Sequence, residues 1–80
     1  DVARNGSGYV VEIAIRNVGE TTAADLTIEG ELLQDTVAVE TSTLTIPYVP
    51  EQAVREAGLF FRHNPNDYKL EIRPMGYDRP

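Results

Sequence analysis

The chain of 80 residues contains no cysteine and only one histidine, His63. Without cysteine it can form neither a disulfide nor a thiolate metal site. A catalytic triad or an imidazole acid–base pair needs a histidine beside a nucleophile, and no serine lies near His63 in the sequence. We therefore expect His63 to be an exposed loop residue, and we expect the chain to be no enzyme and to have no cofactor.

Oxygen ligands for a metal are also scarce. Asn64, Asn66 and Asp67, together with Asp78, could offer oxygens to Ca²⁺. Calcium sites need about six to eight oxygens, usually from several carboxylates. The composition of this segment is ordinary for a turn. We expect no structural metal.

Positive charge is in short supply, with seven basic against 13 acidic residues and a formal net charge of -6. A surface of this sign repels phosphate, which argues against nucleic acid and anionic lipid as partners. No apolar run approaches the roughly 18–20 residues of a membrane helix, and no signal peptide is present. The chain begins with Asp1 rather than methionine, which suggests a piece of a longer protein.

The pattern that is present has a period of two, which is typical of β-strands. It predicts strands over residues 9–16, 24–32, 37–45, 53–62 and 68–73, the third with a bend near residues 41–42. Pro47 and Pro50 bracket a crossover or an edge segment, because proline cannot donate to a central ladder. No amphipathic helix of ten residues is found.

The apolar faces of these strands predict one core, made of Ile13, Ile15, Leu26, Ile28, Leu32, Leu59, Phe61, Leu70 and Ile72. Only one of two consecutive phenylalanines can face inward in a regular strand. We expect an all-β, immunoglobulin-like β-sandwich of five to seven strands, formed as one domain over residues 1–80, with residues 1–7 and 75–80 flexible. Because such a sandwich usually has ~100 residues, at least one sheet edge is expected to be open.

Two resemblances extend this interpretation. The turn Asn17-Val18-Gly19 and the step Thr22-Ala23-Ala24 resemble the adhesion-related immunoglobulin-like domains of bacterial exported proteins. Residues 16–19, 29–32, 48–50, 55–61 and 76–80 are similar to an uncharacterised family of short bacterial proteins that have one N-terminal membrane helix and an immunoglobulin-like β domain outside the membrane. The second resemblance implies a membrane-anchored, extracytoplasmic protein. It implies no activity and no site residues.

Two functions remain open from the sequence. The first is a non-catalytic interaction or structural domain that binds an unknown protein through an open edge or through an aromatic patch of Tyr48, Phe60 and Tyr77. The alternative is a small-ligand or carbohydrate-binding module that uses Tyr9, Tyr48, Tyr68 or Tyr77 as a stacking platform, although the lack of tryptophan weakens it. A pocket with two tyrosines would favour the ligand. A bare edge strand with an exposed Phe60 would favour the partner.

Charged side chains on the outer strand faces bear on self-association. Charges at a sheet edge are a common protection against edge-to-edge aggregation. The strand over residues 24–32 carries three acids outside its apolar face, and Lys69, Glu71 and Arg73 alternate along the last strand. We expect these charges to keep the isolated domain monomeric.

Overall fold

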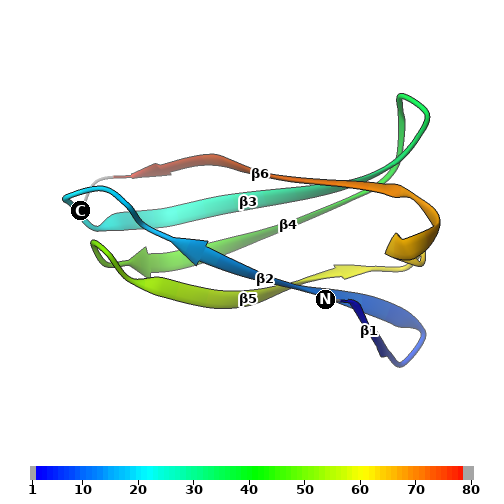
Figure 1. The fold of residues 1–80 in the computed structure, drawn as a ribbon, viewed down its shortest axis with the longest axis horizontal. Helices are drawn as coiled ribbons and strands as arrows, with labels where there is room; N and C mark the ends of the chain where they lie inside the picture. Colours follow the sequence, from blue (N-terminus) through cyan, green and yellow to red (C-terminus); the bar gives the residue numbers. More distant parts are fainter. Residues whose placement is uncertain (1, 79–80) are drawn as a thin grey trace.

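The computed structural model describes residues 2–78. These residues form six strands and one short 3-10 helix: β1 (Val2–Asn5), β2 (Gly8–Arg16), β3 (Ala23–Gln34), β4 (Val37–Val49), β5 (Val54–Phe61), η1 (Pro65–Asp67) and β6 (Lys69–Asp78). The strands make two antiparallel sheets of three, in the orders β1-β2-β5 and β4-β3-β6. Figure 1 shows the sheets as two layers. The expected all-β class is confirmed. Within residues 2–78, no helix has the length and apolar character needed to span a membrane.

The strands differ from the sequence prediction in several places. β4 runs through Pro47 to Val49, which an edge strand tolerates because its outer N–H groups have no partner strand. Its ladder with β3 is regular at residues 41–42, and the irregularity lies instead between Leu32 and Leu33. The predicted bend was therefore placed wrongly. Strands also occupy residues 2–5 and 75–78, the second with shifts of register against β3, while residues 1, 79 and 80 lie outside the described part of the chain.

The core lies between the two layers. It consists of Val11, Leu26, Ile28, Leu32, Ile46, Val49, Leu59 and Phe61. The predicted burial of Phe61 and of four leucine and isoleucine residues, Leu26, Ile28, Leu32 and Leu59, is confirmed. Ile13, Ile15 and Leu70 are only half-buried against this core. Ile72 was predicted wrongly, since it is 41% exposed. It belongs to β6, and among residues 2–78 no strand lies along the outer edge of β6 to cover it.

A kink in β3 explains why alternation did not reveal Val49, whereas Ile46 was missed because the predicted strand ended at residue 45. Asp25 has a φ of 51°, in the left-handed region that aspartate tolerates better than most residues. It pairs with neither neighbouring strand. Ile46 and Val49 are both buried although three positions apart, so the face of β4 that points inward changes opposite this kink.

Gly30 sets how closely the layers approach in the middle of the sandwich. It is buried, and a Cβ atom added to it would lie 2.8 Å from Leu59 Cδ1 and 3.1 Å from Phe61 Cζ, both in the opposite sheet. A glycine within a strand often marks such a close approach. The two sheets therefore pack directly over this position.

Candidate functional site

One side of the sandwich is open between β2 and β6. Within residues 2–78, β1 pairs with β2 only as far as Val11, so residues 12–16 of β2 have a described partner on one side alone, β5. Among residues 2–78, β6 pairs only with β3. Both sheets thus present an unpaired edge toward the same side. A groove of about 350 Å³ opens there, near the turn that joins β2 to β3.

The groove is apolar. Its floor contains the core residues Leu26 and Val49 from β3 and β4, and its walls include Ile15 of β2 with Pro74 and Tyr77 of β6. Leu26 and Val49 are themselves buried, so the uncovered apolar surface belongs to the rim, where Val18 and Tyr77 are exposed. Exposed apolar surface of this kind favours binding of another apolar surface. Among the side chains that the structure describes, Arg16 is the one charged group in the lining of the groove.

Asn17 builds the end wall of the groove. Its side-chain nitrogen donates hydrogen bonds to the carbonyl oxygens of Thr21 (2.8 Å) and Val49 (2.9 Å), and its side-chain oxygen accepts from the N–H of Gly19 (2.9 Å). Its backbone N–H donates to the carbonyl of Ala53 (3.0 Å). Asn17 therefore ties the end of β2, the following turn and the β4–β5 connection together. The sequence indicated a turn here, but gave no sign that this side chain reaches the other sheet.

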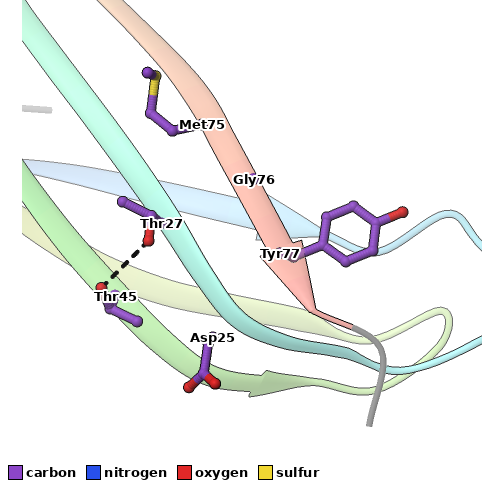
Figure 2. Close-up of a pocket in the computed structure, with 6 residues that line it drawn as sticks. All are labelled: Asp25, Thr27, Thr45, Met75, Gly76 and Tyr77. Atoms are coloured by element: carbon purple, nitrogen blue, oxygen red, sulfur yellow. Dashed lines mark hydrogen bonds between the residues drawn. The ribbon is translucent and has the colours of Figure 1, made fainter.

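A second, wide-open hollow of about 650 Å³ lies on the outer face of the β4-β3-β6 sheet. Figure 2 shows the Thr27 and Thr45 hydroxyls facing each other, 3.4 Å apart, and the Tyr77 ring pointing away from them. Tyr77 is the only tyrosine lining this hollow, and also the only one lining the groove. Neither hollow meets the two-tyrosine condition for a stacking platform.

The three residues of the predicted aromatic patch are all on the surface, but they do not lie together. Tyr48 and Tyr77 are 60% and 58% exposed, and both lie near Ala24, which pairs with Tyr48 on one side and with β6 on the other. Phe60 is 47% exposed and lies in the other sheet, beside Val10. Only Tyr77 contributes to the groove.

His63 takes part in a link between the layers. The Glu40 carboxylate accepts hydrogen bonds from the backbone N–H groups of Arg62 (2.8 Å) and His63 (2.9 Å), and it lies 2.7 Å from His63 Nδ1. The His63 ring also meets Tyr68 edge to face, with 5.7 Å between the ring centres. Partial burial alone would raise the pKa of Glu40, but these hydrogen bonds and the nearby His63 charge outweigh it and lower the pKa.

This lowered pKa makes part of the stability pH-dependent. A carboxylate with a depressed folded-state pKa contributes stability that is present above its unfolded pKa and is lost as the pH falls through the folded pKa. We expect the thermal midpoint of the wild type to fall between about pH 5 and pH 3 more steeply than that of Glu40→Gln. Glu56→Gln, which removes an exposed carboxylate on β5, serves as the control and should leave the slope unchanged. Parallel curves for the wild type and Glu40→Gln would contradict the assignment.

No set of three or more acidic or histidine side chains in the described part of the chain is arranged to hold a metal ion. Comparison with models of protein families, with curated proteins and with solved structures found no match for this chain.

Proposed function

We propose that this chain is a non-catalytic protein-interaction domain that binds its partner at the groove between β2 and β6. The observation that carries the proposal is an apolar groove, floored by core residues, lying between two unpaired strand edges. Unpaired edges offer backbone hydrogen bonds to another chain, and an adjoining apolar surface adds affinity.

The strand order supports an immunoglobulin-like sandwich as the basis of this site. In that fold one sheet begins with the first two strands and the fifth strand of the series, and the other contains the third and sixth. The orders β1-β2-β5 and β4-β3-β6 follow this plan, with β4 as the additional edge strand of the second sheet. The immunoglobulin plan places one more strand on the outer edge of β6. The groove lies beside that vacant position.

The cellular setting rests on the resemblance described above. We place the domain in the extracytoplasmic part of a membrane-anchored bacterial protein. The gene's full-length product tests this directly. A stretch of about 20 apolar residues ahead of this domain is expected, and a product without one would remove the support for anchoring.

Site-specific photo-cross-linking in the parent cell tests the interaction. A photoreactive phenylalanine analogue at Tyr77, on the groove rim, is expected to give an adduct of defined mass. Val37 is the matched control, because it is also an exposed apolar residue but lies at the β3–β4 turn, away from the groove lining. Adding Val18→Glu, a charge at an exposed position of the groove, should abolish the adduct. Equal labelling at both positions, or none, would contradict the proposal.

A further inference from the structure

We infer that the strand beside β6 is supplied by a second copy of this chain. In this dimer the two β6 strands pair antiparallel about a two-fold axis at Ile72, and the two β4-β3-β6 sheets become one sheet of six strands. The inference rests on the proposed function, because it names the partner of the same open side. A symmetric contact of this type closes after two copies and leads to no fibre.

The inner face of β6 shows where a neighbouring strand is missing. A Cβ atom built on Gly30 would have Ile72 Cγ1 within 3.8 Å, together with atoms of Leu59 and Phe61, so Ile72 points toward the core. It nevertheless stays 41% exposed. A strand laid along the outer edge of β6 would cover it. With the axis at Ile72, the two copies of this residue lie opposite each other and each covers the other.

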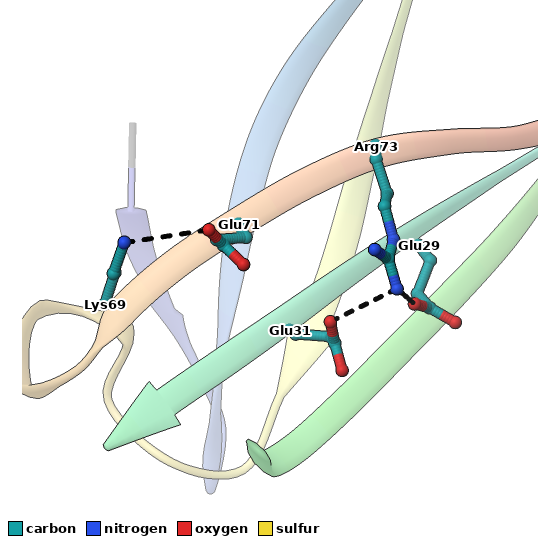
Figure 3. Close-up of polar contacts among 5 residues, drawn as sticks. All are labelled: Glu29, Glu31, Lys69, Glu71 and Arg73. Atoms are coloured by element: carbon teal, nitrogen blue, oxygen red, sulfur yellow. Dashed lines mark hydrogen bonds and ion pairs between the residues drawn. The ribbon is translucent and has the colours of Figure 1, made fainter. Parts of the chain in front are cut away.

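The charges on the outer face of β6 agree with this register. Figure 3 shows Lys69, Glu71 and Arg73 in alternation along the strand. With the axis at Ile72, Glu71 of each copy lies opposite Arg73 of the other, which gives two opposite-charge pairs. An axis one residue away, at Glu71, would place the two Glu71 side chains opposite each other and Lys69 opposite Arg73. Like charges directly opposite are destabilising. An axis at Leu70 would also give opposite-charge pairs, Lys69 with Glu71. It would not place the exposed Ile72 opposite itself, so the exposure of Ile72 decides between the two axes.

Arg73 retains the capacity for such a pair. Its guanidinium donates to Glu29 at 3.1 Å and lies 3.5 Å from Glu31, yet its side chain is 60% exposed. A guanidinium carries five N–H donors, so these two contacts leave others available. Glu71 is close only to Lys69 among the charged groups of the described chain, at 3.7 Å.

The direction of the added strand also agrees with the fold. The immunoglobulin plan adds an antiparallel strand beside β6. A two-fold axis perpendicular to the sheet also makes the two β6 strands antiparallel. Pro74 would face Leu70 of the second copy and has no N–H to donate. The new ladder is consequently short, and we expect a dimer that forms at micromolar to millimolar concentration. From the sequence, the outer-face charges predict a monomer. The dimer inferred here is the opposite expectation, and the mass of the protein in solution decides between them.

Disulfide trapping tests the register, because the native chain has no cysteine. Opposite residues of an antiparallel pair have Cα atoms about 4.5–5.5 Å apart, which a disulfide can bridge. Ile72→Cys should therefore cross-link to itself. Glu71→Cys and Arg73→Cys should each fail alone but cross-link when mixed. Thr43→Cys, on the exposed edge strand β4, measures random collision. Cross-linking of Ile72→Cys at only the Thr43→Cys rate would overturn the inference.

Sedimentation equilibrium provides the second test. The wild type should rise from its 8.9 kDa monomer mass toward twice that value as concentration increases. Glu71→Lys, which replaces two attractive pairs with two repulsive ones, should weaken association about tenfold. A wild type that stays monomeric at millimolar concentration, or an unaffected Glu71→Lys, would overturn the dimer. If photo-cross-linking at Tyr77 then captures a different protein, the proposed function stands and only this inference fails.

Discussion

Phe61→Ala should remove a large share of the free energy of unfolding of the domain. Phe61 is fully buried between the sheets, and removing such a ring costs about 3–5 kcal/mol because a cavity remains. A domain of this length has about 4–12 kcal/mol in total. Urea denaturation followed by circular dichroism gives the free energy of unfolding of both proteins.

Phe60→Ala is the matched control for this measurement. Phe60 is the same residue type one position earlier in β5, and about half of its surface is exposed. Its loss should cost about 1 kcal/mol, mainly from the part of the ring that lies against Gly8. Successive strand residues point to opposite faces, so equal losses for the two substitutions would show that the assigned register of β5 is wrong by one residue.

Asn17→Ala should destabilise the domain by about 2–3 kcal/mol. The substitution removes three side-chain hydrogen bonds, each with a net contribution of roughly 1 kcal/mol. One of them joins the first sheet to the carbonyl of Val49 in the second sheet, at the groove floor. The chemical denaturation midpoint measures the loss, and cross-linking from Tyr77 should fall with it.

Two further variants separate the hydrogen bonds of Asn17 from the general effect of truncation. Asn17→Asp keeps the acceptor for Gly19 but loses both donors and places a negative charge beside two carbonyl oxygens, so it should be at least as unstable as Asn17→Ala. Asn5→Ala truncates an exposed asparagine in β1 and should change stability by less than about 0.5 kcal/mol. A stable Asn17→Asp would refute the role given to the donors.

The sequence predicted those parts of the fold in which alternation is regular. Leu26, Ile28 and Leu32 follow a strict period of two within one strand, and all three are buried as expected. Val49 pairs with Ala23, which lies on the far side of Asp25 in β3, and Asp25 has a left-handed backbone conformation. The sequence pattern of β4 carries no information about the backbone conformation of β3. Ile72 obeys the period and points inward, but its exposure depends on a missing neighbour, which a periodicity within one strand does not record.

The candidate site was less predictable than the core. The groove is assembled from β2, the turn after it, β3, β4 and β6, which come together only through the crossing of the chain between layers. The sequence predicted Tyr77 as part of an exposed aromatic patch, and Tyr77 does line the groove. The sequence also predicted Phe60 as part of this exposed patch. Phe60 is exposed, but it lies in the other sheet, beside Val10.

The pairing of strands that are remote in sequence has a consequence for how the domain folds. Only β1–β2 and β3–β4 are neighbours joined by short hairpin turns. β2 pairs with β5 and β3 pairs with β6, and these partners are far apart in the sequence. The pairs Tyr9–Phe61 and Ile28–Pro74 therefore form late in folding. Topologies dominated by such non-local contacts fold in milliseconds to seconds. The β3–β4 hairpin can form first, and β6 can dock only after the rest of the chain has emerged and collapsed. Until β6 docks, the edge of β3 with which it pairs is exposed. A newly synthesised chain would be most prone to incorrect strand pairing at this edge.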